Sequence, residues 1–318
     1  MTSERRRPVS AGIARPEEWG GALLFLFGHL PEEERQGQMR ELLGQVGRGE
    51  LSLAGLVVAR AEDASTGGSS QLRGAMLTVL QKDGTAMMFS PVLADVGDRE
   101  TAEGLLQATT EWFQSTDGKL AQCLIEQTDG LFSTVLKNQG YPRLAELIFM
   151  QRELEELPEY SLGELDFVTY SESRHDEFVR TLGETYVDSR DCPELSSIRS
   201  PEDAICGHRE AGKFLPEHWY LYRLQGESIG LAILTEHTDA KLWELVYVGL
   251  RPGFRGRGFA GTLLTHALHQ ARFAKMSALT LAVDAANEPA VRLYEKLGFA
   301  EVVRKDAHLR WKREERGN

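Results

Sequence analysis

The chain has 318 residues, of which 42% are hydrophobic and 26% are charged, and its formal net charge is −12. This length favours two domains over a single core, and the negative charge argues against a nucleic-acid partner. The longest apolar run, Ala22–Phe27, is far shorter than the roughly 20 residues that cross a bilayer. Three cysteines without metal-ligand spacing indicate neither a disulfide framework nor a metal site. We therefore expect a cytoplasmic protein without nucleic-acid, membrane or metal partners.

The first half of the chain alternates helical and strand patterns. Apolar residues at helical spacing predict helices near residues 17–28, 31–47, 101–115 and 130–138. Alternating and β-branched runs predict strands near residues 53–60, 72–81, 85–92, 120–126 and 144–153. The Gly/Ser-rich run at residues 64–70 predicts a flexible hairpin tip.

The second half contains a longer series of strands. We expect strands near residues 165–169, 219–225, 228–236, 241–250, 278–284, 299–303 and 307–312. Helices are expected near residues 174–186, 201–212, 259–274 and 288–297. Gln225-Gly226 is the expected turn of a central hairpin, and the last two strands are expected to form a second one. Antiparallel central strands followed by crossover helices imply a mixed sheet.

The two halves share one pattern at an offset of 158 residues. Leu105 falls on Leu263, and Gly140 falls on Gly298. We therefore predict a duplicated domain of the α/β (α+β) class, each copy a mixed, mainly antiparallel sheet flanked by helices. Pro158 interrupts the pattern between the copies, so the expected domains are residues 1–158 and 159–318.

A glycine-rich turn, Arg255-Gly256-Arg257-Gly258-Phe259-Ala260, lies between an apolar run and a helix-like run. Its glycines can take positive φ and have no Cβ, so successive backbone N–H groups can converge on one anion. The following helix adds free N–H groups and the positive end of its dipole, and the two arginines add charge. Residues 251–318 carry a net charge of +6, against −18 for residues 1–250. The turn therefore predicts a phosphate-binding site.

Together with a second motif, this turn resembles the GNAT superfamily of acyl-CoA-dependent N-acyltransferases. Arg255, Gly258 and Ala260 fit the family's phosphate signature, and Asn287–Phe299 fits its downstream segment. The resemblance covers residues 164–312, and the tandem arrangement is similar to that of mycothiol synthase, without assigning that substrate. It implies two tandem GNAT-like domains. It also implies that the second uses acetyl-CoA, and no metal, to acetylate a primary amine of a small molecule or peptide by direct attack.

The first copy lacks these features. At the offset, Gly97–Ala102 replaces the turn, so the carboxylates of Asp98 and Glu100 stand where a pyrophosphate would lie and would repel it. Leu136 stands where the second copy has Tyr294. We therefore expect the first domain to be degenerate and to bind no such cofactor.

The resemblance implies cofactor contacts in the second domain. Backbone groups of Val248, Gly249 and Leu250 would pair with pantetheine. Asn287 would cap the next helix and touch the cofactor. The residues that would hold the pyrophosphate are Arg255, Gly256, Arg257, Gly258, Phe259, Ala260 and Gly261.

Two side chains are catalytic candidates by the same resemblance. Tyr294 aligns with a tyrosine near the CoA sulfur, where a phenol with a pKa of about 10 can protonate a thiolate; the alternative is a tyrosine packed in the core. Glu244 aligns with the base of histone-type acetyltransferases; the alternative is a polar residue of a half-exposed strand. Acceptor contacts are expected from residues 186–220, which include Asp191 and His208. The competing function is a non-catalytic acyl-CoA sensor.

Overall fold

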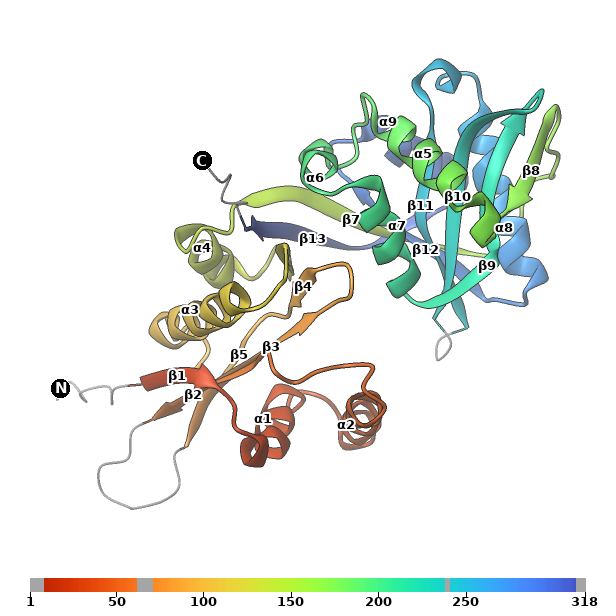
Figure 1. Cartoon of the computed structure of the whole chain (residues 1–318). Coiled ribbons are helices and arrows are strands. Elements are labelled where there is room, and N and C mark those ends of the chain that lie inside the picture. The colour runs from red at the N-terminus through yellow and green to blue at the C-terminus, as the bar shows by residue number, and fades with distance from the viewer. Residues whose placement is uncertain (1–8, 62–70, 238–240, 313–318) are drawn as a thin grey trace, which may run out of the picture. The chain divides into compact units, whose positions relative to one another are not determined.

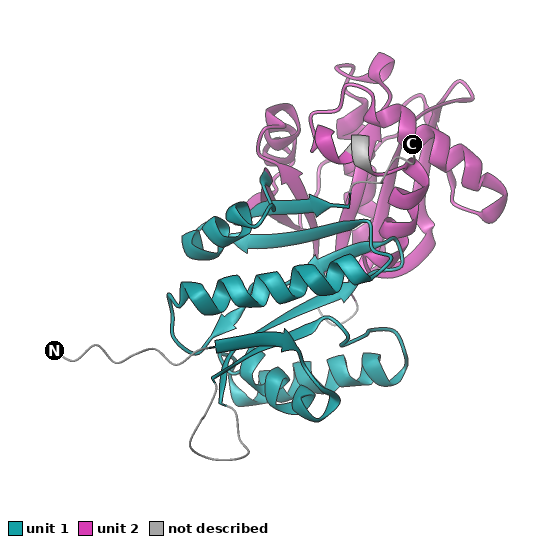
Figure 2. Cartoon of the chain, turned by 60° about the vertical axis from the view of Figure 1, so that its left-hand side comes forward, with its two compact units in different colours: residues 1–143, 306–318 teal, residues 144–305 magenta. Residues whose placement is uncertain are grey.

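The computed structural model describes residues 9–61, 71–237 and 241–312 (Figure 1). The hairpin tip predicted at residues 64–70 lies outside these ranges. The chain divides into two compact units (Figure 2): unit 1 comprises residues 1–143 and 306–318, and unit 2 comprises residues 144–305. Each unit has a mixed sheet flanked by helices, so the predicted fold class is confirmed.

Unit 1 has the strand order β1-β2-β3-β4-β6-β13, with β5 beside β3. Its strands are β1 (Val9–Ile13), β2 (Leu56–Ala61), β3 (Leu72–Leu80), β4 (Thr85–Met88), β5 (Val92–Leu93), β6 (Leu120–Glu126) and the end of β13 (Ala300–Trp311). Its helices are α1 (Trp19–Leu26), α2 (Glu32–Gly47), α3 (Arg99–Ser115) and α4 (Gly130–Asn138). One core packs α1 and α2 against the sheet, and another packs α3 and α4 against it.

Unit 2 has the strand order β7-β12-β11-β10-β9-β8. Its strands are β7 (Arg143–Glu153, within unit 2 from Leu144), β8 (Leu165–Thr169), β9 (Lys213–Leu224), β10 (Glu227–His237), β11 (Leu242–Leu250), β12 (Ala278–Asp284) and the start of β13. Its helices are α5 (His175–Tyr186), α6 (Pro193–Ile198), α7 (Pro201–Glu210), α8 (Phe259–Phe273) and α9 (Glu288–Lys296). The β11–β12 pair is parallel, and the ladders from β8 to β11 are antiparallel.

The two faces of the unit 2 sheet carry separate cores. Trp243, Leu245 and Leu250 of β11 belong to the core formed with α8 and α9. Val246 and Tyr247 pack instead with the core formed with α5 and α7. Because the adjacent residues Val246 and Tyr247 pack with the same core, strict alternation is interrupted at this point of β11, and its side chains are divided between two different environments.

The units do not divide at the predicted join near Pro158. Leu147–Glu153 of β7 pairs with β12 along the whole of that strand, which makes β7 a strand of unit 2. The end of β13 belongs to unit 1, where the Leu309 N–H donates to the carbonyl of Pro142 at 3.1 Å. A proline marks where a pattern stops, but ladder hydrogen bonds decide which unit a strand joins.

The repeat is visible in the elements themselves. Strand β12 and helix α9 begin and end 158 residues after β6 and α4, respectively. Some predicted elements differ from the observed ones: β1 and α6 were not predicted, and residues 300–311 form the single strand β13 where a hairpin was predicted over residues 299–312. Residues 85–92, predicted as one strand, divide into β4 and β5 around Pro91, which has no N–H for a ladder.

No helix within the described ranges is long and apolar enough to cross a membrane.

Candidate functional site

Strands β11 and β12 diverge after a short parallel pairing. The pairing joins Leu242–Glu244 to Ala278–Thr280 and then ends, while β11 stays paired with β10 as far as Leu250. An extra residue in β11, Val246, interrupts the register with β10, because Ile233 pairs with Tyr247 and Leu234 with Leu245. Such a bulge bends a strand and redirects its side chains. Beyond Glu244, one edge of β11 is therefore free of its parallel neighbour.

The divergence opens a cavity of about 830 Å³ within unit 2. Its walls come from β11, β12, the start of α8, helix α9 and the loop after α5. Most of the predicted cofactor residues line it: Val248, Gly249, Leu250, Arg255, Gly256, Gly258, Ala260, Gly261 and Asn287, together with Tyr294. The structure thus gathers residues that the sequence places up to 46 positions apart.

The glycine turn has the backbone conformation that its sequence predicts. Gly256 and Gly258 have φ values of 72° and 88°, in the left-handed region. Gly258 is the N-cap of α8 and provides no side chain to cap it. Gly261 donates its N–H to the carbonyl of Gly258 at 3.1 Å. The N–H groups before it, with the positive end of the helix dipole behind them, form an environment that suits an anion.

Gly249 is required by close packing. A Cβ at this position would lie 2.6 Å from the Tyr247 hydroxyl oxygen and 2.9 Å from Cβ of Thr185 on α5. Those two neighbours are joined by a hydrogen bond of 2.8 Å between their hydroxyl groups. The glycine thus marks a close approach of β11 and α5.

The side chain of Arg255 binds backbone carbonyl groups of the protein itself. Its guanidinium donates to the carbonyl oxygens of Leu250, Asp188 and Thr185 at 2.9, 3.0 and 2.8 Å. It therefore ties the turn to the end of α5 and to the loop that follows, while its charge still contributes to the local field.

Arg257 and Phe259 do not line the cavity; they contact each other. The Arg257 guanidinium carbon lies 5.0 Å from the Phe259 ring centre and 5.6 Å from that of Phe254, and the arginine side chain is exposed. This is cation–π geometry on the outside of the turn.

Asn287 occupies the N-cap position of α9, as predicted, but makes no capping hydrogen bond with its side chain. Its side chain lines the cavity instead. The N-terminus of α9 is thereby left without a side-chain acceptor, as is that of α8.

Tyr294 is a buried tyrosine with an unused hydroxyl. It is only 7% exposed and lines the cavity, and its ring packs edge-on against Phe299. Within the described residues its hydroxyl makes no hydrogen bond. Burial, and secondarily the charge of Asp191, raises the pKa of Tyr294, which is therefore a protonated donor at neutral pH. The ring therefore packs in the core while the residue borders the cavity, and the catalytic role of Tyr294 stays a prediction.

Glu244 lies one residue before the part of β11 that lines the cavity. Its carboxylate binds Nε2 of His237 at 2.7 Å. By alternation it points to the face of β11 that carries α5 and α7, opposite the side chains of Trp243 and Leu245. The structure places it near the divergence of the strands, with a partner that the sequence did not indicate.

The predicted acceptor segment divides between cavity and core. Asp191 lines the cavity, whereas His208 packs against Tyr247 with its ring centre 5.6 Å away. Burial lowers the pKa of His208 to about 3, so its imidazole is neutral. Asp284 was not predicted as a site residue: its carboxylate accepts the N–H of Cys192 at 3.3 Å. No motif links Asp284 to this loop, because the contact spans 92 residues.

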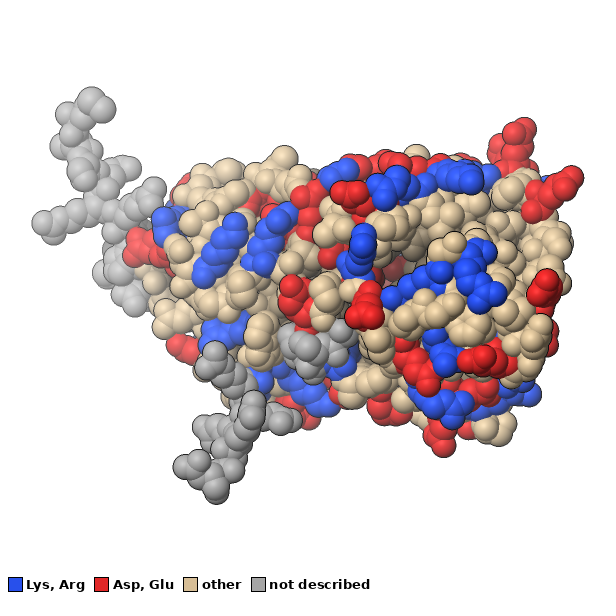
Figure 3. Space-filling view, turned by 90° about the horizontal axis from the view of Figure 1, so that it is seen from above, with Lys and Arg blue, Asp and Glu red and all other residues tan. Residues whose placement is uncertain are grey.

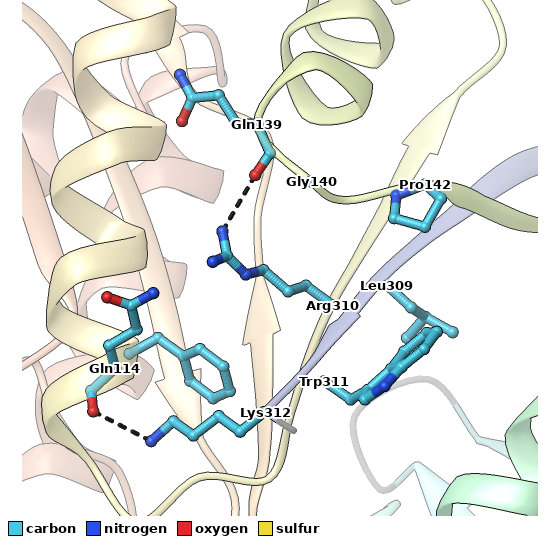
Figure 4. Close-up of a pocket in the computed structure, with 9 residues that line it drawn as sticks. Gln114, Gln139, Gly140, Pro142, Leu309, Arg310, Trp311 and Lys312 are labelled. Atoms are coloured by element: carbon cyan, nitrogen blue, oxygen red, sulfur yellow. Dashed lines mark hydrogen bonds between the residues drawn. The ribbon is translucent and has the colours of Figure 1, made fainter. Parts of the chain in front are cut away.

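A second cavity, of about 750 Å³, lies in unit 1 (Figure 4). Arg310 donates to the carbonyl of Gln139 after α4, and Lys312 donates to the carbonyl of Gln114 in the last turn of α3. Cations at helix C-termini stabilise the exposed carbonyl ends. Both charges are therefore used within the fold of unit 1.

On one face of the molecule, the surface charges do not separate into large regions of one sign (Figure 3). On the face shown in Figure 3, acidic and basic side chains lie close to one another. The excess of positive charge in residues 251–318 is therefore a local feature of the segment that carries the turn.

Comparison with known proteins agrees with this geometry. Residues 183–299 match the model of the Acetyltransferase (GNAT) family. Unit 2 therefore contains a GNAT acetyltransferase domain. The chain is also 32% identical over 165 residues to a mycothiol acetyltransferase of Thermomonospora curvata, a match that covers 51% of this chain and 54% of that protein. The chain thus spans about half the length of the curated relatives it matches.

Solved structures extend the likeness in fold to the whole chain. A GCN5-related N-acetyltransferase of Sphaerobacter thermophilus superposes with a TM-score of 0.63 at 18% identity, covering 96% of both chains. A tandem GNAT protein from the clavulanic acid biosynthesis pathway superposes with a TM-score of 0.53 at 12% identity, covering 96% of this chain and 98% of that one. The predicted resemblance to tandem GNAT proteins is confirmed.

Proposed function

We propose that the chain is an acetyl-CoA-dependent N-acetyltransferase whose unit 2 binds acetyl-CoA and whose unit 1 binds no such cofactor. The observation that supports this most directly is the cavity between the diverging strands β11 and β12, with the uncapped N-terminus of α8 beside it. The likeness to a mycothiol acetyltransferase supports acetyl transfer to an amine, while the acceptor of this chain is a separate question.

The residues present fit acetyl-CoA. The N–H groups from Gly256 to Ala260 and the dipole of α8 suit a pyrophosphate, whereas the Gly261 N–H already donates to the carbonyl of Gly258 at 3.1 Å. The free edge of β11 from Val248 to Leu250 offers backbone donors and acceptors that suit the amides of pantetheine. Asn287 and Tyr294 lie on the α9 side of the same cavity. Acetyl-CoA would supply an activated acetyl group as its thioester.

In the proposed reaction, the nitrogen of a neutral primary amine attacks the thioester carbon directly. The new C–N bond forms as the C–S bond breaks, and the bonding pair leaves on sulfur. Tyr294 donates its hydroxyl proton towards that thiolate, and the proton that the nitrogen loses after attack restores the phenol. The ammonium form of the substrate must lose one further proton before attack. We assign this step to Glu244. Because Glu244 does not line the cavity, the proton would reach its carboxylate through a water molecule.

Binding of acetyl-CoA tests the proposal first. A ligand that binds only the folded state at 100 times its Kd adds about 2.7 kcal/mol to the free energy of unfolding, so the wild-type Tm should rise. Gly258→Glu should abolish this rise, because it places a carboxylate where the phosphate would bind. Gly258→Ala is the matched control, since it shares the strain at φ 88° without adding charge and should keep part of the rise.

Acetyl transfer is tested by the release of free thiol from acetyl-CoA in the presence of amines. Release that depends on an amine supports the enzyme. A wild-type Tm that rises with acetyl-CoA, without thiol release for small amines, amino sugars or peptides, would instead favour the acyl-CoA sensor. A wild-type Tm unchanged by acetyl-CoA, or an equal rise in wild type and Gly258→Glu, would contradict the cofactor assignment.

A further inference from the structure

The loop after α5 closes one side of the cavity of unit 2. It runs from Val187 to Cys192 and contains two non-glycine residues with positive φ, Asp188 at 53° and Cys192 at 43°. Arg255 holds its first part through the carbonyl of Asp188. The loop is therefore kept in a conformation that costs energy, as is common where side chains must be aimed at a ligand.

The far end of this loop is fixed to the end of β12 by two reciprocal hydrogen bonds. Asp191 accepts the N–H of Asp284 at 3.1 Å, and Asp284 accepts the N–H of Cys192 at 3.3 Å. A further bond from the N–H of Ala286 at 2.9 Å holds the buried carboxylate of Asp284. Asp191 is thereby held in place by a backbone donor on one oxygen, which leaves its other oxygen for a ligand.

Asp191 is exposed to the cavity and has no cationic partner. It lines the cavity, and no Lys, Arg or His within the described ranges forms an ion pair with it. Protein around the carboxylate, together with the negative charge of Asp284, raises the pKa of Asp191, and a cation bound there would relieve that cost. An unpaired carboxylate in this setting favours a positively charged ligand.

A second observation points to a ligand at the same place. The hydroxyl of Tyr294, on a side chain that is 7% exposed, reaches the cavity without a hydrogen bond to any described residue. Between the strands, the floor is formed in part by Ala282, a small residue whose surface is exposed in the middle of the sheet. The Tyr294 hydroxyl is not fully enclosed by protein, so it is open to the cavity as a donor that a bound molecule can use.

We infer that the acceptor is a cationic amine whose ammonium group is bound by the carboxylate of Asp191. This inference rests on the proposed acetyltransferase function and specifies its substrate class. The carboxylate holds the ammonium by a charge-assisted hydrogen bond beside Tyr294, where the thiolate would leave, until its extra proton passes through water to Glu244 and the neutral nitrogen attacks. Asp191 is thus a specificity residue, which selects amines over neutral molecules of the same shape.

The test compares KM values for an amine acceptor in wild type and in Asp191→Asn. The asparagine side-chain oxygen can still accept the N–H of Asp284, so the variant removes charge while keeping the contact that holds the loop. With glucosamine, ethanolamine and lysine amide as probes, KM for the best acceptor should rise about ten- to hundredfold, the loss expected for one hydrogen bond to a charged group. Stabilisation by acetyl-CoA should be unchanged.

Two further variants make the result decisive. Asp191→Glu keeps the charge and should recover a KM closer to that of wild type. Glu295→Gln removes one charge from an exposed position of α9 that does not line the cavity, and its KM should equal that of wild type. An Asp191→Asn protein that melts like wild type and has the KM of Glu295→Gln would overturn the inference. The inference would also be overturned if acetyl-CoA stabilises the wild type but none of these amines causes thiol release. That result would leave the proposed cofactor binding intact. A wild type that acetyl-CoA does not stabilise would overturn both proposals.

Discussion

The helices that correspond in the two units differ in how their N-termini are capped. In unit 1, Asp98 caps α3 by accepting the N–H of Thr101, and Asp129 caps α4 by accepting the N–H of Phe132. In unit 2, Gly258 and Asn287 hold the N-cap positions of α8 and α9 without a capping side-chain bond. The same fold thus uses its helix N-termini in two ways. In unit 1, aspartate carboxylates accept the free N–H groups of these termini; in unit 2, no side chain caps the termini, so their N–H groups can bind an external anion.

The strand that precedes this helix also differs between the two units. In unit 2, β11 continues unbroken through Gly249 to Leu250 and keeps one edge free. At the offset of 158 residues, unit 1 has Pro91, which separates β4 from β5. A proline offers no N–H, so this segment cannot present the row of donors and acceptors that β11 has. The two units thus share a scaffold, while unit 1 lacks the two turn glycines, the uncapped helix N-termini and the continuous strand that would serve a cofactor in unit 2.

The largest expected effect comes from the tyrosine that only unit 2 has. Tyr294→Phe should lower kcat about a hundredfold, the usual scale for a general acid, while the Kd for acetyl-CoA stays the same. Its Tm should not fall, because the lost hydroxyl has no partner among the described residues. Steady-state kinetics and thermal unfolding measure both quantities.

The matched control is Tyr141→Phe in unit 1. The Tyr141 hydroxyl is 2.9 Å from that of Thr110, and both residues are buried. This variant should lose about 1 kcal/mol of unfolding free energy, because Thr110 is left unpaired, and should keep kcat. An unchanged kcat in Tyr294→Phe, combined with a lower Tm, would return Tyr294 to a purely structural role.

The next effect concerns the close approach at Gly249. Gly249→Ala should reduce the unfolding free energy by about 1–3 kcal/mol, because its Cβ must displace Thr185 or Tyr247. Gly253→Ala is the control: no atom lies within 4 Å of a Cβ there, and its φ is not in the left-handed region. Urea denaturation measures the difference. Equal stability of the two variants would show that β11 and α5 can separate without cost.

A smaller effect should distinguish the capped from the uncapped helices. Asp98→Ala should reduce the unfolding free energy by about 1 kcal/mol through loss of the N-cap bond to Thr101. It should not create acetyl-CoA binding in unit 1, because Pro91 and Leu136 remain. Asn287→Ala should leave stability nearly unchanged, since no capping bond is lost, and should weaken acetyl-CoA binding. The reverse pattern, a stability loss only in Asn287→Ala, would contradict the proposed use of the N-termini.

The sequence predicted those parts of the site that depend on local backbone chemistry. Gly256 and Gly258 have the positive φ that the turn required, and Asn287 lies at the N-cap. It did not predict that Arg255 would bind carbonyls, because its partners Thr185 and Asp188 lie about 70 residues earlier in the chain. Contacts of that kind depend on the final packing of the loop after α5, and no spacing rule encodes them.

The sequence also did not show which neighbouring strand each predicted strand pairs with, for a similar physical reason. The pattern of residues 144–153 identified a strand, but a strand pattern does not specify its ladder partner. Its pairing with β12 became visible only in the fold. In the same way, residues 299–312 contain apolar residues that suit either a hairpin or one long strand, and the pairing of β13 decided for one strand.

The smallest expected effect is a pH dependence that only unit 2 has. Glu244 binds His237, whereas at the offset unit 1 has the fully buried Ala86. The hydrogen bond to Glu244 raises the pKa of His237 above 6.5 in the folded chain. The pair therefore stabilises the fold below the unfolded pKa of 6.5, and this contribution disappears as the pH rises through the folded pKa.

The variant His237→Gln measures this contribution. Because the His237 side chain is 42% exposed, solvent screens the interaction, and we expect a loss of about 0.5 kcal/mol at pH 6 that vanishes by about pH 9. Thermal unfolding at the two pH values gives the difference between wild type and variant. The variant also bears on the base: if Glu244 accepts the substrate proton, removing its cationic partner should not lower kcat at high pH. A kcat that falls in His237→Gln at every pH would mean that the imidazole takes part in the proton transfer assigned to Glu244.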